Sequence, residues 1–286
     1  KPNRPANNLN TIDVNNRSNA FVLKSDIKIF GGFPSTGNPD MTQRDWNINV
    51  TTLSGDIGTI NDSSDNCYHV VISSGAIGVA ELNGFTVTKG LSNEYTAIIV
   101  NDNYISNDIG GGMYNAASNP FIVNCKFSQN TAKNGGGMFN INSTPIVSKS
   151  TFSENFSEYS GGGMFNSSSS PIITNSTFSG NKAHSGGGVY IIFSSPTITN
   201  CIFSGNSATE IAGGMYINSS SPMITNCFFS GNSATEMAGG MYNHTSSPTI
   251  TNSNFSGNSA YYGGGMSNYY SSPTITISAF SGNTAS

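Results

Sequence analysis

The acidic side chains that could hold a metal ion lie early in the chain. Asp56, Asp62 and Asp65 fall within ten residues of one another. Calcium takes several oxygen ligands, many of them from carboxylates, so this segment can be interpreted as a calcium loop. Its spacing is not that of an EF-hand, and aspartate is equally common in plain turns. We therefore expect no cofactor, with calcium near these three residues as the alternative.

Clustered carboxylates on one face would indicate a polysaccharide lyase or hydrolase. Beyond residue 109 the only acids are four glutamates, and Glu210 and Glu236 occupy equivalent positions of the repeat described below. Other copies have Lys133, Tyr159 or His184 at that position. Such a mixture is typical of a variable exposed bend. We expect no catalytic residue and no enzymatic activity, with a polysaccharide-active enzyme as an alternative.

The four cysteines do not form a recognisable framework. None belongs to a Cys-x-x-Cys pair, which argues against a zinc site. Cys201 and Cys227 occupy equivalent positions in neighbouring copies of the repeat, within the reach of a disulfide. Serine takes that position in other copies. This exchange favours two small half-buried thiols, and the disulfide stays open as the alternative.

Composition limits the partners. Charged residues make up 9% of the chain, the net charge is -4, and lysine and arginine do not cluster, so we expect no nucleic-acid partner. No apolar run reaches 18 residues, so we expect no transmembrane segment. With 36% hydrophobic residues and 17 phenylalanines the chain has enough apolar material for a core.

A repeat of 25 or 26 residues organises residues 110–286. Each copy has two glycines followed by Met or Val, then a proline, then a phenylalanine with an asparagine three residues later. The aliphatic positions are Met113, Met138, Met164, Val189, Met215, Met241 and Met266. The phenylalanines are Phe127, Phe152, Phe178, Phe203, Phe229, Phe255 and Phe280. The asparagines are Asn130, Asn155, Asn181, Asn206, Asn232, Asn258 and Asn283.

One copy predicts one coil of a solenoid. Its three short runs of β-forming residues are bounded by Gly, Pro, Asn or Ser, and no run is long enough for a helix. One copy cannot bury its apolar face alone, whereas stacked copies can. The fold class is therefore all-β, a right-handed parallel β-helix with three short strands in each 25–26-residue rung.

Stacking places equivalent residues above one another, about 4.8 Å apart. We expect the Phe and Met columns to point inward. The Asn column should lie at a bend, where each amide bonds to the amides above and below and Asn tolerates left-handed geometry. Neighbours along a strand face opposite sides. The residue after each Met should therefore face outward, as a possible exposed binding column of Tyr114, Phe139, Phe165, Tyr190, Tyr216 and Tyr242.

The motifs carry a family resemblance. Residues 135–138 read Gly-Gly-Gly-Met and residues 203–206 read Phe-Ser-Gly-Asn. Over residues 110–286 this pattern resembles the repeat of polymorphic outer-membrane proteins and related bacterial β-helix surface proteins. The resemblance implies an exported protein, extracellular or on the bacterial cell surface, and an adhesin-like role.

Residues 1–109 lack the clear repeat but keep strand-like runs. We interpret them as irregular N-terminal rungs with longer loops, continuous with the seven regular rungs of residues 110–286; a separate domain is the alternative. The segment from Gly31 to Asp56, which holds the only tryptophan, Trp46, resembles the opening of many bacterial β-helix proteins.

No polar capping unit is visible at the C-terminal end of the repeat, and an uncapped rung exposes strand edges and core. We expect either a fragment of a longer protein or end-to-end association of copies, which would propagate into a fibre.

The leading hypothesis is a non-enzymatic extracellular structural or adhesive solenoid, assembled into a surface fibre. A glycan-binding module is the second hypothesis, because exposed rings in a row suit sugar stacking, although a ring ladder can simply stabilise a sheet.

Overall fold

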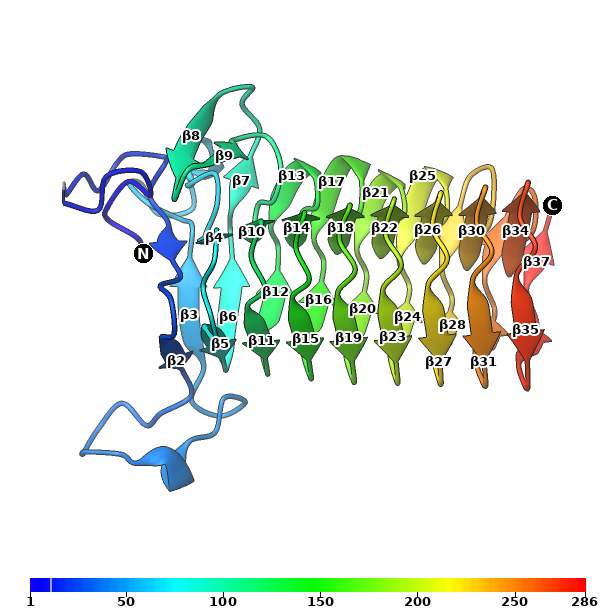
Figure 1. The fold of residues 1–286 in the computed structure, drawn as a ribbon, viewed down its shortest axis with the longest axis horizontal. Helices are drawn as coiled ribbons and strands as arrows, with labels where there is room; N and C mark the ends of the chain where they lie inside the picture. The colour runs from blue at the N-terminus through cyan, green and yellow to red at the C-terminus, as the bar shows by residue number, and fades with distance from the viewer. Residues whose placement is uncertain (11) are drawn as a thin grey trace.

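The computed structural model describes residues 1–10 and 12–286. They form one elongated solenoid whose rungs lie side by side along the long axis, from the blue N-terminal end to the red C-terminal end (Figure 1). Loops from the first hundred residues project from the N-terminal rungs. In the described part of the chain, strands pair in parallel with strands one rung away, apart from one antiparallel hairpin.

Three walls of the solenoid are nine-stranded parallel sheets, named here for the residues that most of their strands point inward. The Met sheet consists of β1 (Phe21–Val22), β4 (Val71–Ser74), β10 (Met113–Ala116), β14 (Met138–Ile141), β18 (Met164–Ser167), β22 (Val189–Ile192), β26 (Met215–Asn218), β30 (Met241–His244) and β34 (Met266–Tyr269). The Ile sheet consists of β2 (Lys28–Phe30), β5 (Glu81–Asn83), β11 (Phe121–Val123), β15 (Ile146–Ser148), β19 (Ile172–Thr174), β23 (Thr197–Thr199), β27 (Met223–Thr225), β31 (Thr249–Thr251) and β35 (Thr274–Thr276). The Phe sheet consists of β3 (Thr51–Ser54), β6 (Phe85–Thr88), β12 (Lys126–Ser128), β16 (Thr151–Ser153), β20 (Thr177–Ser179), β24 (Ile202–Ser204), β28 (Phe228–Ser230), β32 (Asn254–Ser256) and β36 (Ala279–Ser281).

A fourth, eight-stranded parallel sheet of short strands completes the rungs; most of its strands bury an alanine, and it is called the Ala sheet. It consists of β7 (Leu91–Ser92), β13 (Thr131–Asn134), β17 (Phe156–Ser160), β21 (Lys182–Ser185), β25 (Ser207–Ile211), β29 (Ser233–Ala234), β33 (Ser259–Ala260) and β37 (Thr284–Ala285). The remaining elements are the antiparallel hairpin of β8 (Ala97–Val100) and β9 (Asn103–Ser106), and the 3-10 helices η1 (Met41–Gln43) and η2 (Ser63–Asp65).

The register follows the sequence repeat residue for residue. Met113 pairs with Met138, and Phe127 pairs with Phe152. The predicted parallel β-solenoid with three strands per rung is confirmed. The Ala sheet adds a further short strand in the segment after each repeated asparagine, which the sequence pattern alone marks only as a turn. Such a short run is a strand only because the rungs on either side offer it partners.

The chain turns between walls at single residues with a positive φ. One of them directly precedes each repeated asparagine, as at Gln129 (φ 57°), Glu154 (φ 56°) and Gly205 (φ 60°). This corrects the expectation that the asparagines themselves provide the left-handed geometry, because none of them has a positive φ. The asparagine side chains must point into the rung to form the ladder hydrogen bonds. The residue before each asparagine points to open space, so that residue can adopt the positive φ of the turn.

The first hundred residues supply the first two rungs of the same solenoid. β1, β2 and β3 pair with β4, β5 and β6, which in turn pair with β10, β11 and β12. Longer loops leave these rungs at residues 31–50, which include η1, at residues 55–70, which include η2, and at residues 93–112, which include the hairpin. In the first loop Arg44 donates from Nε to the carbonyl of Gly31 at 2.5 Å and lies over the Trp46 ring.

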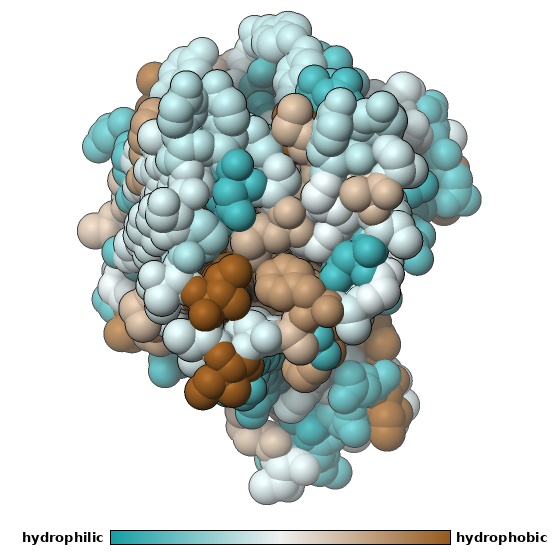
Figure 2. All heavy atoms as spheres, turned by 90° about the vertical axis from the view of Figure 1, so that its right-hand side faces the viewer, coloured by the Kyte–Doolittle hydropathy of each residue, from teal (hydrophilic) through white to brown (hydrophobic). Residues whose placement is uncertain are grey.

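The last rung of the described chain presents its interior. β34, β35 and β36 each have one neighbour in their sheet. Ile275 and Phe280 are 39% and 45% exposed, whereas their equivalents one rung back, Ile250 and Phe255, are fully buried. Figure 2 looks onto this end and shows hydrophobic side chains gathered near its centre, with more hydrophilic ones around them.

Candidate functional site

The Phe and Met columns form the core. Phe127, Phe152, Phe178, Phe203, Phe229 and Phe255 are fully buried, and neighbouring ring centroids, including that of Phe280, are 4.6–5.0 Å apart. Met113, Met138, Met164, Val189, Met215 and Met241 are also fully buried, and Met266 in the last rung is half-buried. These residues pack, and they offer no surface to a ligand.

The predicted asparagine ladder is confirmed. Asn206 illustrates it: its Nδ2 donates to the carbonyl of Phe178 and to Oδ1 of Asn232, both at 2.9 Å. Its own Oδ1 accepts from both the backbone N–H and the Nδ2 of Asn181, at 3.0 and 2.9 Å. Each amide thus joins the rung before it to the rung after it. All its polar atoms are used, so the ladder is structural.

A second ladder of buried asparagines, which was not predicted, lies in the Met sheet. Asn115 donates to Asn140 at 2.7 Å, and Asn140 donates to Asn166 at 2.8 Å. Ile191 and Ile217 replace the amide in the next two rungs, and the ladder resumes at Asn243 and Asn268. The signal was present as the asparagine two residues after the methionine, on the same inward face of the strand.

The aromatic column lies on the outer face of the Met sheet, but it is not the exposed surface that the sequence suggests. Tyr114, Phe139 and Tyr242 are only 3–5% exposed, and Phe165, Tyr190 and Tyr216 are half-buried. Ile98 and Ile105 of the hairpin belong to the apolar cluster around Tyr114 and Phe139. Ala212, Ala238 and Met237 cluster with Tyr242.

The half-buried rings also lack free faces. Phe165 stacks on Tyr190 with centroids 5.0 Å apart, and Tyr190 stacks on Tyr216 at 4.6 Å. A sugar that stacks on a ring needs the ring face, and here each neighbour in the column occupies it. The column therefore stabilises the sheet, as cross-strand aromatic pairs do.

The cysteines are free and buried in the structure. Burial raises the pKa of the Cys67 thiol to about 12 and that of the Cys125 thiol to about 11. The hydrogen bond with Cys227, together with burial, raises the pKa of Cys201. Cys201 and Cys227 take the same inward corner position as Ser253, whose Oγ accepts from the backbone N–H of Cys227 at 3.1 Å. A small side chain is what this corner requires.

The three early aspartates have separate partners. Asp56 Oδ2 accepts a hydrogen bond from Lys89 Nζ at 2.8 Å. This bond keeps the pKa of Asp56 below its usual range, although burial acts in the opposite direction. Asp62 caps η2 by accepting from the backbone N–H of Ser64 at 2.9 Å. Asp65 accepts from the backbone N–H of Thr59 at 2.7 Å. Among the described residues, no group of three or more His, Cys, Asp or Glu side chains is placed to hold a metal ion.

The variable column of Glu210 and Glu236 lies on the outer edge of the Ala sheet. There Glu210 forms an ion pair with Nε2 of His184, and both side chains are substantially exposed. Lys133 of the same column is buried, with Nζ 3.0 Å from the centroid of the Tyr95 ring. Among the described residues, no second carboxylate forms a side-chain hydrogen bond or ion pair with His184 or Glu210. The pair is therefore a surface contact between two rungs.

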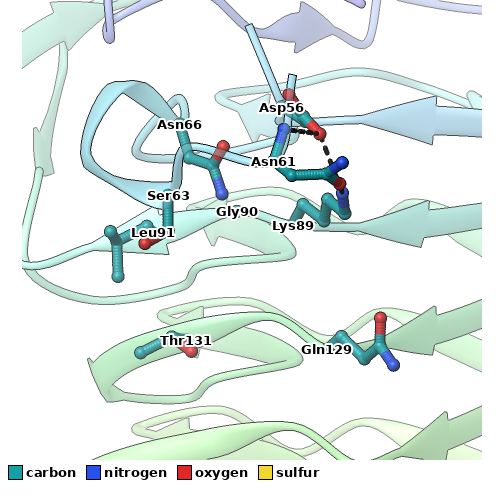
Figure 3. A pocket seen from close by; sticks show the side chains of 9 residues that line it. All are labelled: Asp56, Asn61, Ser63, Asn66, Lys89, Gly90, Leu91, Gln129 and Thr131. Carbon is teal, nitrogen blue, oxygen red and sulfur yellow. Dashed lines mark hydrogen bonds and ion pairs between the residues drawn. The ribbon is translucent and has the colours of Figure 1, made fainter. Parts of the chain in front are cut away.

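A polar cleft lies beside this sheet, under the loop that carries η2 (Figure 3). It encloses about 280 Å³, and its lining side chains come from three successive rungs. Asp56, Asn61 and Lys89 form one side. Lys89 Nζ bridges them, bonding to Asp56 at 2.8 Å and to Asn61 Oδ1 at 2.9 Å. Asp56 was among the predicted residues, but no sequence pattern shows that Lys89, a rung later, forms an ion pair with it, as Lys1 also does at 3.7 Å.

Asn66 lines the cleft from the loop, with its side-chain nitrogen turned down toward Gly90 and its oxygen turned up, away from Gly90 (Figure 3). It is only 7% exposed, and within the described chain its Oδ1 is buried without a hydrogen-bond partner. Arg17 fixes the loop from behind, donating from Nε to the Asn66 carbonyl at 2.8 Å and from Nη2 to the Leu91 carbonyl at 3.0 Å. Arg17 therefore joins the backbone of the η2 loop to that of β7.

An exposed ring continues the cleft along the axis. Thr131 lines the cleft and pairs directly with Phe156 on the next strand of the Ala sheet. Phe156 is 46% exposed and, among the described residues, makes no ring contact. Unlike the rings of the aromatic column, nearly half of its surface is exposed.

Comparison with known proteins identifies the fold. The sequence model of a family described as the right-handed β-helix region matches residues 59–229, which is more than half of the chain. Searches of the curated proteins and of the solved structures find no match. The described part of the chain contains no helix that is both long and apolar enough to span a membrane.

Proposed function

Because the chain belongs to the right-handed β-helix family, we propose that it is a non-enzymatic extracellular scaffold, a stiff rod with a structural or adhesive role. The observation that carries the proposal is the unbroken asparagine ladder from Asn130 to Asn283, which joins all seven regular rungs. A rod built this way resists bending at any single point, since no rung is joined to the next by backbone bonds alone.

The outer surface supports the same proposal. Where the Ile sheet turns into the Phe sheet, Asn252 donates to Asn226 at 2.7 Å and Asn226 donates to Asn200 at 3.0 Å. Threonines such as Thr199 and Thr251 stand beside them on the outer face of the Ile sheet. Hydroxyls and amides keep this surface hydrated with few charges, so its contacts with another surface depend little on salt.

The scaffold role is tested by location and by activity together. Antibody against the folded chain should label the surface of intact source cells, and the purified chain should release no reducing sugar or unsaturated product from pectin, alginate or host glycans. Labelling only after the cells are permeabilised would contradict the extracellular role. Cleavage of any of these polymers at a rate that survives repurification would contradict the non-enzymatic role.

End-to-end association is a narrower form of the proposal, because the rungs stack in one parallel register that a rung of a second copy could continue. Negative-stain electron microscopy over a concentration series should show filaments, and Ile277→Lys, at a side chain 82% exposed in the last described rung, should shorten them. Ile99→Lys is the matched control on the hairpin, at a side chain 63% exposed. Isolated rods at every concentration would remove the fibre and leave the scaffold role standing.

A further inference from the structure

We propose that Lys89 and Asn61 become joined by an isopeptide bond, formed within the folded chain with Asp56 as the acceptor of the lysine proton. The bond ties the loop that carries η2 to the corner after β6, one rung further along the solenoid. This inference goes beyond the scaffold role and does not depend on it. It rests on an amine, an amide and a carboxylate that meet on one side of the polar cleft.

The three groups contact one another directly. Lys89 Nζ donates to Oδ1 of Asn61 at 2.9 Å and to Oδ2 of Asp56 at 2.8 Å. The same Asp56 oxygen accepts from the backbone N–H of Asn61 at 3.2 Å. In Figure 3 the amide of Asn61 and the ammonium of Lys89 meet end to end, with the carboxylate beside both. Because Oδ1 is bonded to Cγ, the amine lies next to the carbon that it attacks.

The backbone at both residues fixes this approach. Lys89 and Asn61 have φ values of 62° and 65°, so each lies at a sharp single-residue turn. Asparagine tolerates this conformation, whereas lysine rarely adopts it. Glycine takes the position of Lys89 in later rungs, as at Gly180 and Gly205. Two groups held together in this way react as though at an effective concentration of about 10⁵–10⁸ M when they are well oriented.

The carboxylate is largely shielded from water. The side chain of Asp56 is 7% exposed and that of Lys89 is 35% exposed. The second carboxylate oxygen, Oδ1, lies 3.7 Å from Nζ of Lys1. Among the described residues, Lys89 is the one lysine whose Nζ reaches both this carboxylate and a side-chain amide. The amine that can react is therefore defined by the geometry.

The reaction balances without any further reactant. Lys89 gives a proton from Nζ to Asp56, and the lone pair of the neutral amine attacks Cγ of Asn61. The bond from Cγ to Nδ2 then breaks. Asp56 returns the first proton to Nδ2 and passes on a second from the attacking nitrogen, so the leaving group departs as ammonium. One C–N bond forms, one breaks, and nothing is oxidised or reduced.

The first proton transfer sets the pace. The hydrogen bond from Lys89 keeps the pKa of Asp56 below its usual range, so the carboxylate accepts the proton reluctantly. The bond should therefore form slowly after folding. It should form faster as the pH rises, since only the neutral amine has a lone pair to attack.

Mass spectrometry of the purified full chain, kept folded at pH 9, tests the bond. The intact mass should lie below that of the sequence by one molecule of ammonia. Trypsin does not cut after an acylated lysine, and Lys89 is the only cleavage site within residues 45–126 before Lys126. Residues 45–126 should therefore be recovered as one peptide that is also lighter by one ammonia, whereas an unlinked chain gives two peptides.

Four variants assign the roles. Lys89→Arg keeps the positive charge but cannot form the bond, and Asn61→Ala removes the amide, so both should have the full mass. Asp56→Asn should slow the loss of ammonia about a hundredfold, the usual effect of a proton-transfer group. Lys182→Arg is the matched control at an exposed lysine of the Ala sheet, and should lose ammonia as the natural sequence does.

Three results would overturn the inference. The first is a full mass that persists through prolonged incubation at pH 9. The second is a loss of ammonia that remains in Lys89→Arg, which would assign it to a succinimide at an Asn-Gly pair such as Asn83-Gly84. The third is an unchanged rate in Asp56→Asn, which would remove the carboxylate from the reaction. Circular dichroism confirms that each variant is folded; if Asp56→Asn is not, Asp56→Ser replaces it with the same expected slowing.

Discussion

At the scale of single residues, the solenoid depends on side chains that serve two rungs at once. The amide of Asn206 accepts from one neighbour and donates to the other, and it also satisfies the carbonyl of Phe178. Its removal therefore affects three rungs, although only one residue changes.

Asn206→Ala should lower the free energy of unfolding by about 3 kcal/mol, because it leaves buried backbone groups without partners at roughly 1–3 kcal/mol each. Asn283→Ala, in the half-buried last position of the same ladder, should cost about 1 kcal/mol, since water can reach the groups it frees. Urea denaturation followed by circular dichroism measures both. Equal losses at the two positions would contradict the idea that burial sets the cost.

His69 should make stability depend on pH. It is fully buried beside Tyr114, with Nδ1 3.0 Å from the Gly110 carbonyl, and burial lowers its pKa from 6.5 to about 4. The folded state thus binds a proton less readily than the unfolded state. Stability is full above pH 6.5 and is lost as the pH falls toward 4, by about 2 kcal/mol between pH 7 and pH 5.

The check on His69 is the slope of unfolding free energy against pH. His69→Gln should flatten it between pH 7 and pH 5. A slope that is the same in both proteins would assign the pH dependence to other groups.

The cysteines should be unreactive toward thiol reagents in the folded protein. The raised pKa values of Cys67 and Cys125 leave almost no thiolate at pH 8, and all four side chains are buried. Ellman's reagent should detect no thiol in buffer and four in guanidinium chloride without reductant. Two thiols in the denatured sample would instead indicate a disulfide between Cys201 and Cys227.

At the scale of elements, each rung is brought close to its neighbours by the glycines before the Met sheet. A Cβ on Gly214 would lie 2.4 Å from the carbonyl oxygen of Gly240. A Cβ on Gly205 would meet nothing within 4 Å, although φ is +60°. The two positions thus have glycine for different reasons: Gly214 because there is no space for a Cβ, and Gly205 because of its positive φ.

Gly214→Ala should cost about 3 kcal/mol or more, because backbone must move to admit the methyl group. Gly205→Asn should change stability by less than about 0.5 kcal/mol, since asparagine tolerates a positive φ. Thermal unfolding of the two variants side by side separates the two roles. A neutral Gly214→Ala would mean that the rungs can spread apart.

The elements also show which features of the fold could be predicted from the sequence. Period-two alternation placed Met113 inward and Tyr114 outward, because a strand leaves no other choice. It could not show that Tyr114 would be covered, since the covering residues Ile98 and Ile105 belong to a hairpin outside the repeat. The cleft stayed hidden for the same reason: Asp56, Asn66 and Lys89 meet through loops whose paths no periodicity fixes.

At the scale of the whole molecule, almost every interface joins one rung to the next. Hydrogen exchange should therefore be slowest in the central rungs, which have neighbours on both sides, and faster in β34, β35 and β36, which have one. The hairpin of β8 and β9 should exchange fastest of all the strands, because only two strands pair there. Mass spectrometry of exchanged peptides measures this order. Uniform protection from end to end would mean that the solenoid opens as a single unit.

The matched register of paired residues has a consequence for how such a chain can change its length. Val189 pairs with Met164 on one side and with Met215 on the other, and all three belong to the Met column. If residues 189–214 were lost, Met215 would follow Gly188 and meet Met164 in the same register, with asparagine again opposite asparagine. Unequal recombination between copies would thus yield a shorter or longer rod at no cost in register, so that length itself becomes a heritable variable which mutation adjusts one coil at a time.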